Sequence, residues 1–303
     1  MAAEQKPAPL DPIIADMDRK WRESGIPGLY VGGNGPVSRE RARNIRALLY
    51  PKPNLPTDRI ERSTIAGPNG PITIETVWPV EGEPLGTLVY YHGGGWIIGD
   101  IDSHQAHAIR FANRARVVVV NVDYRLAPEH SFPQGVDDAI AAAQWASANL
   151  ARLGGATKPL CVGGDSAGGN FAAAVALVCR DTGIKLTAQV LLYPATNMTD
   201  VRDPDIRKAY FGDAAEQNSR SPKASPVLAR LEGVAPAILG VGPYDFLYQD
   251  NLAYVAALRA AKVPLIYREF PTLNHGFFSY TAISPACAAA ADQICDDLRG
   301  LLS

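Results

Sequence analysis

The sequence has only four cysteines in 303 residues, and their spacing matches no zinc-ligand pattern. A chain of this length can bury a large core without disulfides, so we expect buried thiols in a cytoplasmic, reducing environment. The sequence also lacks an apolar run of about 20 residues and an apolar signal segment near its start, which predicts no contact with a membrane. Lysine and arginine (29) do not outnumber aspartate and glutamate (31), so no surface for nucleic acid is expected.

The chain divides into two parts of unequal length, residues 1–50 and residues 51–303. In the first part, Ile14, Met17 and Trp21 recur at the spacing of one helical face, and polar residues stand between them. The apolar face of a helix must pack on another element, and this segment precedes every predicted strand. We therefore expect residues 1–50 to form a helical cap on a larger domain made of residues 51–303.

In the larger part, short apolar runs alternate with helical stretches. Runs that are apolar throughout are typical of strands buried on both faces. Strands that alternate with helices predict an α/β fold, with a mostly parallel sheet flanked by helices and functional groups at the carboxyl ends of its strands. The predicted strands are Ile72–Pro79, Leu88–Tyr91, Val117–Val122, Leu160–Val162, Val190–Leu192, Ala237–Val241 and Leu265–Phe270, and the main predicted helices are Asp137–Leu153, Ala167–Cys179 and Leu252–Ala261.

A glycine-rich turn stands where the predicted strand Leu160–Val162 meets the following helix. It reads Gly164-Asp165-Ser166-Ala167-Gly168, which is the G-x-S-x-G pattern in its strand-to-helix setting. Side chains at the two flanking positions would clash in so sharp a turn, which explains the glycines. The turn lifts the Ser166 hydroxyl clear of the backbone, and the helix N-terminus behind it favours developing negative charge. The pattern predicts that Ser166 is a nucleophile.

A serine nucleophile needs a base, and in this arrangement the acid and then the histidine follow the serine along the chain. Of the five histidines, His275 alone follows Ser166. It lies in the loop after the predicted strand Leu265–Phe270. Asp245 follows the preceding predicted strand, so we expect it to orient His275. Asp250 is the alternative acid, although its position favours the first turn of the next helix.

A second glycine-rich segment, His92–Trp96, follows a buried strand of the predicted sheet and contains three successive glycines. Successive glycines allow backbone N–H groups to approach a ligand closely, and acyl hydrolysis needs such donors for the oxyanion. We expect Gly95 to make the bend and His92 to brace the loop by hydrogen bonds, because a base at His92 would break the chain order. The predicted oxyanion donors are the N–H groups of Gly93, Gly94 and Ala167.

Other residues are weaker candidates for the site. His104 and His107 lie three apart on a predicted helix, but no further metal ligand stands near them in sequence. We expect them on a solvated helix face, with no metal and no cofactor in the protein. Trp96 is a candidate wall of the substrate pocket, since ligand pockets are rich in aromatic residues. Asp165 and Phe246, which adjoin the nucleophile and the acid, are further pocket candidates.

Together these motifs resemble the hormone-sensitive lipase family, also called the bacterial family IV esterases. The resemblance rests on His92–Trp96, Asp123–His130, Gly164–Gly168 and Asn274–Phe277, and it covers roughly residues 58–300. Asp165 places the chain with the branch that has aspartate before the serine. The resemblance implies an α/β-hydrolase fold, a cap made largely from the N-terminal helices, metal-free ester hydrolysis and frequent dimers.

The chain departs from the family's pattern at two places. The family usually has proline after the acid and a second aspartate four residues after it, where this chain has Phe246 and Gln249. The stretch Thr196–Ser225 is also shorter than in the family, as if a helix that covers the pocket were missing. We therefore expect the N-terminal helices to be the main lid and the pocket to be open on one side.

These residues predict a carboxylesterase that hydrolyses short-to-medium acyl esters through an acyl-enzyme. An amidase or an acyltransferase would use the same triad, and the sequence does not separate these activities. A receptor on this fold that only binds a small molecule needs no activated nucleophile, so intact Ser166 and His275 disfavour it. The apolar strand Leu265–Phe270 is expected at an edge of the sheet, which together with the resemblance favours a homodimer.

Overall fold

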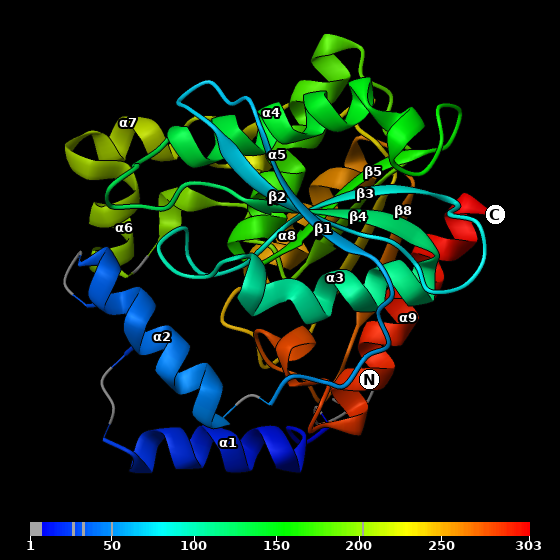
Figure 1. Cartoon of the computed structure of the whole chain (residues 1–303). Helices are drawn as coiled ribbons and strands as arrows, with labels where there is room; N and C mark the ends of the chain where they lie inside the picture. The colour runs from blue at the N-terminus through cyan, green and yellow to red at the C-terminus, as the bar shows by residue number, and fades with distance from the viewer. Residues whose placement is uncertain (1–7, 26–27, 32–33, 50, 202) are drawn as a thin grey trace, which may run out of the picture.

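The computed structural model describes residues 8–25, 28–31, 34–49, 51–201 and 203–303, which form an eight-stranded sheet flanked by helices (Figure 1). The strands are β1 (Ile60–Ile65), β2 (Ile72–Val77), β3 (Gly86–Tyr91), β4 (Val117–Asp123), β5 (Leu160–Asp165), β6 (Ala188–Leu192), β7 (Ala237–Val241) and β8 (Leu265–Glu269). The helices are α1 (Pro12–Glu23), α2 (Gly35–Leu49), α3 (Ile101–Ala115), α4 (Gln134–Ala148), α5 (Ala167–Thr182), α6 (Pro204–Phe211), α7 (Ala215–Ser219), α8 (Tyr248–Ala260) and α9 (Pro285–Leu302). Among the helices described, none is long and apolar enough to span a membrane.

The strands lie in the order β1-β2-β4-β3-β5-β6-β7-β8. All neighbours from β4 to β8 are parallel, and β2 pairs antiparallel with both β1 and β4. The predicted mostly parallel α/β sheet is therefore confirmed, and β8 lies at an edge as expected. The sequence pattern did not predict β1. Its four central residues, Glu61–Thr64, are exposed and give neither an apolar run nor a regular alternation of apolar and polar residues.

Helices cover both faces of the sheet: α4 and α5 lie over one face, and α3 and α9 lie over the other (Figure 1). The first four residues of β4, Val117–Val120, are fully buried between these layers. Burial of each valine side chain contributes about 1.5–3 kcal/mol. The first half of α5 is buried on all sides and consists mainly of alanine and glycine, so its backbone lies close to the strands.

The N-terminal segment is helical, as predicted. The residue that caps its first helix contacts the C-terminal part of the chain. Asp11 caps α1, because its Oδ1 accepts hydrogen bonds from the N–H groups of Ile13 (2.9 Å) and Ile14 (3.1 Å). The Asp11 N–H donates to the Thr272 carbonyl (2.8 Å), and the Ser284 hydroxyl donates to Asp11 Oδ2 (3.3 Å). The start of α1 is therefore attached to the segment that carries His275.

Arg39 of the second helix, α2, contacts the part of the chain that forms the sheet. Arg39 of α2 donates to the Ile97 carbonyl (3.1 Å), just beyond the glycine-rich segment, and forms an ion pair with Glu129. The two helices lie outside the sheet layers, and α2 extends toward α6 (Figure 1). They thus cover the side of the molecule that contains the contacts of Arg39 with Ile97 and of Asp11 with Thr272.

The stretch Thr196–Ser225 does contain a covering helix, contrary to our expectation. Helix α6 begins after Asp203, whose Oδ1 accepts hydrogen bonds from the next two free N–H groups, and Pro204 occupies the first helical position. An aspartate followed by proline is a sequence signal for a helix start. Ile206 of α6 lines the same cavity as Ile45 of α2, so the cavity is covered from both sides.

Gly168 gives a direct test of the packing between α5 and β3. A Cβ atom on Gly168 would lie 1.9 Å from the Tyr91 carbonyl oxygen, and a backbone atom cannot move aside cheaply. We expect Gly168→Ala to lower the free energy of unfolding by about 3 kcal/mol. Gly300→Ala in α9 is the matched control, because nothing lies within 4 Å of its Cβ position. Alanine there should stabilise the protein by roughly 0.5–1 kcal/mol.

Chemical denaturation of both variants measures the two effects. Equal stability of Gly168→Ala and the wild-type protein would show that the contact between α5 and Tyr91 is looser than described.

Candidate active site

Ser166 occupies the turn between β5 and α5 with an unusual backbone conformation. Its φ is +53° and its ψ is −115°, a combination that costs energy for any residue with a side chain. The neighbouring glycines make the turn possible: a Cβ on Gly164 would lie 2.4 Å from the Gly168 backbone. The Ser166 N–H donates to the Leu192 carbonyl of β6 (2.8 Å), which fixes the turn against the next strand.

Three side chains that are distant in sequence form a hydrogen-bonded chain at this turn. His275 Nε2 lies 2.9 Å from Ser166 Oγ, and His275 Nδ1 lies 2.9 and 2.8 Å from the two carboxylate oxygens of Asp245. Asp245 is buried and also accepts a hydrogen bond from the Leu247 N–H (2.7 Å), which holds its carboxylate in place. A proton on Nδ1 leaves Nε2 free to accept the proton of the serine hydroxyl.

Asp250, the alternative acid, has different partners. It accepts hydrogen bonds from the Thr196 N–H (2.6 Å), the Thr196 hydroxyl (2.7 Å) and the Asn197 N–H (3.2 Å). It lies in the first turn of α8, as its position in sequence predicted. Burial raises its pKa, although these hydrogen bonds oppose the shift. Asp250 therefore anchors the loop after β6 and leaves Asp245 as the partner of His275.

The glycine-rich loop differs from our prediction at one donor. The Gly93 N–H donates to Asp165 Oδ1 (3.0 Å), so it is not available for an oxyanion. In the described part of the chain, the N–H groups of Gly94 and Gly95 have no hydrogen-bond partner. Both residues have positive φ (+131° and +57°) and line the cavity beside Ser166. Gly95 therefore replaces Gly93 as a candidate donor, together with Gly94 and Ala167, the first residue of α5.

His92 braces this loop, as predicted. Its Nδ1 lies 2.9 Å from the Gly93 carbonyl oxygen, and its ring stacks on Tyr124 with 4.1 Å between centroids. Burial, together with the nearby His104, lowers the pKa of His92 to about 3. The ring is therefore neutral at neutral pH, and its Nδ1–H donates to the carbonyl.

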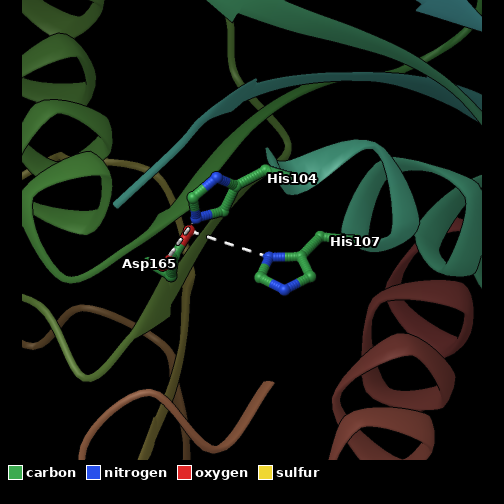
Figure 2. Close-up of side chains that lie close together, drawn as sticks. All are labelled: His104, His107 and Asp165. Carbon is green, nitrogen blue, oxygen red and sulfur yellow. Dashed lines mark ion pairs between the residues drawn. The ribbon is translucent and has the colours of Figure 1, made fainter. Parts of the chain in front are cut away.

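His104 and His107 are buried, contrary to the predicted solvated face. Figure 2 shows both rings pointing from α3 toward Asp165 at the end of β5. His104 Nε2 lies 3.5 Å from Asp165 Oδ2, and His107 Nδ1 lies 3.9 Å from Asp165 Oδ1. Their spacing in sequence placed them on one helix face, but it did not show that this face packs against the sheet.

Asp165 keeps its charge in this buried setting. Burial alone would raise its pKa, but His104, His107 and the hydroxyl of Tyr90 outweigh burial and hold the pKa of this carboxyl well below its usual range. The Tyr90 hydroxyl donates to Oδ1 at 2.8 Å. The residue before Ser166 is thus a buried carboxylate with polar partners on several sides.

A cavity of about 1020 Å³ lies over Ser166 and His275. All three pocket candidates line it: Trp96, Asp165 and Phe246. Trp96 is buried and stacks on Tyr210 of α6 at 4.5 Å. Phe246 is 79% exposed at the mouth, and its ring centroid lies 4.4 Å from that of His275. The remaining walls are largely apolar and include residues of the N-terminal helices and their connection, namely Trp21, Leu29, Tyr30, Ala42 and Ile45.

Comparison with known proteins identifies the family of this chain. A family model described as "alpha/beta hydrolase fold" matches residues 88–279. The chain belongs to this α/β-hydrolase family. The carboxylesterase NlhH of Mycobacterium tuberculosis is 36% identical over 307 residues, which cover 94% of this chain and 93% of that protein. The arylesterase of Saccharolobus solfataricus is 32% identical over 275 residues, which cover 85% of this chain and 89% of that protein.

Solved structures agree over almost the whole chain. A Pyrobaculum calidifontis esterase superposes with a TM-score of 0.87 at 33% identity, covering 96% of this chain and 99% of the other. The family resemblance that the sequence motifs indicated is therefore confirmed.

The buried histidines make the stability of the protein depend on pH. Burial and the neighbouring His104 lower the pKa of His107 to about 3. Unfolding returns His107 to an ordinary pKa near 6.5, so below that pH the unfolded chain binds more protons than the folded protein. Stability should therefore fall as the pH falls from about 6.5 toward 3. His107 should account for roughly 1–2 kcal/mol of the loss between pH 7 and pH 5.

Chemical denaturation of the wild type and His107→Gln at pH 7 and pH 5 tests this expectation. Each protein serves as its own reference at pH 7, so a loss of packing in the variant does not affect the comparison. The variant should lose less stability than the wild type on acidification, and an equal loss in both would contradict a neutral buried His107.

Proposed function

We propose that the protein is a carboxylesterase that hydrolyses short-to-medium acyl esters with a triad of Ser166, His275 and Asp245. The observation that carries the proposal is the continuous hydrogen-bonded chain from Asp245 through His275 to Ser166, with a donor–acceptor distance of 2.9 Å at the serine. Ser166 and His275, at one end of this series of hydrogen bonds, line a cavity large enough for a small ester. Relatives named as carboxylesterase and arylesterase support this assignment.

In the proposed reaction, Ser166 Oγ attacks the ester carbonyl carbon while His275 Nε2 accepts the hydroxyl proton. Asp245 holds the Nδ1–H and stabilises the imidazolium that forms. The oxyanion of the tetrahedral intermediate accepts hydrogen bonds from the N–H groups of Gly94, Gly95 and Ala167. His275 then gives its proton to the departing alcohol, and a water molecule activated by the same histidine hydrolyses the acyl-enzyme.

We further propose that residues 1–50 act as the cap of the active site and residues 51–303 as the catalytic domain. Trp21 and Ile45 from the first segment line the cavity, and the Tyr30 hydroxyl would lie 2.3 Å from a Cβ on Gly95. The cap therefore approaches the proposed oxyanion donors. Its apolar residues suit the alkyl part of an ester and limit the access of bulk solvent to the pocket, while single water molecules still reach the acyl-enzyme.

The proposed triad can be tested by measuring kcat for four variants and by covalent labelling of the wild type. Ser166→Ala and His275→Ala should each lower kcat by several orders of magnitude, and Asp245→Asn should lower it about 10³–10⁴-fold. Asp250→Asn is the matched control and should cost far less, because its carboxylate has no bond to His275. A fluorophosphonate should label Ser166 in the wild type.

Ester turnover in His275→Ala at the wild-type rate would refute the triad. Labelling of Ser166 with turnover of amides but not of esters would retain the nucleophile and replace the esterase by an amidase.

We also propose that the protein is cytoplasmic and forms homodimers. All four cysteines are buried free thiols, which is typical of proteins from a reducing compartment. Strand β8 ends the sheet and pairs with β7 on one side, so its outer edge offers backbone groups to a second strand. Light scattering at micromolar concentration should give a mass twice that of one chain. A mass of one chain under these conditions would contradict the dimer.

A further inference from the structure

The carboxylate of Asp165 connects the nucleophile turn to the glycine-rich loop. Asp165 is the last residue of β5 and directly precedes Ser166. Its Oδ1 accepts the Gly93 N–H at 3.0 Å. A Cβ on Gly93 would lie 2.3 Å from Oδ2, so the carboxylate covers the Gly93 peptide closely. The side chain next to the nucleophile thus holds the backbone of the loop across from it.

Side chains from two further elements hold this carboxylate in turn. The hydroxyl of Tyr90, in β3, donates to Oδ1 at 2.8 Å. His104 and His107, in α3, place Nε2 3.5 Å from Oδ2 and Nδ1 3.9 Å from Oδ1 (Figure 2). The Asp165 side chain is 6% exposed, so solvent competes little for these contacts. Its position is therefore determined by β3, by α3 and by the loop itself.

The bond to Gly93 decides which N–H groups of the loop remain for a substrate. An N–H group that donates to a carboxylate is removed from the set of oxyanion donors. The next two peptides, at Gly94 and Gly95, line the cavity, and within the described residues their N–H groups have no partner. We propose that Asp165 is a positioning residue of the oxyanion hole: its carboxylate fixes Gly93 and thereby orients the donors that follow. This inference rests on the proposed esterase reaction.

The same three side chains also offer the donor set of a metal site. Two imidazole nitrogens and a carboxylate oxygen lie within 4.8 Å of one another. Asp165 Oδ1, however, already accepts two hydrogen bonds, and the Tyr90 hydroxyl lies 3.4 Å from His107 Nδ1. These contacts favour a hydrogen-bonded network over a metal site. The experiment below includes metal binding as one of its possible outcomes.

The experiment compares wild type, Asp165→Ala and Asp165→Asn in two measurements. The first is the kcat and KM for a short acyl ester. The second is the Kd of an alkylboronic acid, whose tetrahedral adduct on Ser166 places an oxygen in the oxyanion hole. Asp165→Ala should lower kcat about 10²–10³-fold and weaken the boronate by a similar factor, with KM changed less than about threefold. Asparagine keeps an oxygen that accepts the Gly93 N–H, so Asp165→Asn should recover at least about tenfold in both.

Tyr90→Phe is a third variant, which removes one hydrogen bond to the Asp165 carboxylate and keeps the bond from Gly93. It should fold even if Asp165→Ala does not, and it should lower kcat and boronate affinity together by about threefold to tenfold. A kcat loss without weaker boronate binding in these variants would overturn the proposal. So would equal losses in Asp165→Ala and Asp165→Asn.

Two controls separate this proposal from its alternatives. If Ser166→Ala keeps wild-type turnover, the proposed function itself fails, whatever Asp165 does. If purified wild type holds one equivalent of a transition metal and chelation lowers kcat as much as Asp165→Ala does, the cluster is a metal centre and the positioning role is refuted. We expect no effect of chelation on kcat.

Discussion

The close contact between α5 and the end of β3 is the constraint on which the rest of the structure depends. Gly164 and Gly168 have no room for a Cβ, because the backbone of Tyr91 lies against both. The contact forces Ser166 into its strained turn, and it also brings the start of the glycine-rich loop beside the serine. One packing contact between backbones thus sets the distance between Ser166 and the proposed oxyanion donors.

Around this contact the protein uses buried polar groups to hold backbone in place. Asp245 fixes His275, Asp250 fixes the loop after β6, and Asp165 fixes the glycine-rich loop. Asp165 and Asp245 are buried and Asp250 is half-buried, and each accepts a hydrogen bond from a segment at least 30 residues away in sequence. Such groups are costly to bury unless every partner is present, so the loops that carry the chemistry are held as firmly as the strands.

The parts of the site that depend on local pattern or on chain order could be predicted from the sequence. The strand-turn-helix around Ser166 is local, and the order of acid and histidine selected the residues now found hydrogen-bonded to it. Gly93 was misassigned because its partner, Asp165, lies 72 residues away. The burial of His104 depends on how α3 packs, which periodicity alone does not show. Helix α6 was missed although Asp203 and Pro204 signal its start.

The attachment of α1 has a consequence for biosynthesis. The Asp11 carboxylate and its partner Ser284 are separated by 273 residues, and at 5–20 residues per second the ribosome needs roughly 15–55 s to make the chain between them. For most of that time the segment from Thr272 to Ser284 does not yet exist, so Asp11 lacks both of its partners there. Nascent chains of this protein therefore lack the hydrogen bonds that hold the start of α1 until residue 284 has been made. The hydrogen-bonded chain from Asp245 to Ser166 forms only after residue 275 has been made, so shorter chains carry the Ser166 turn without its histidine partner.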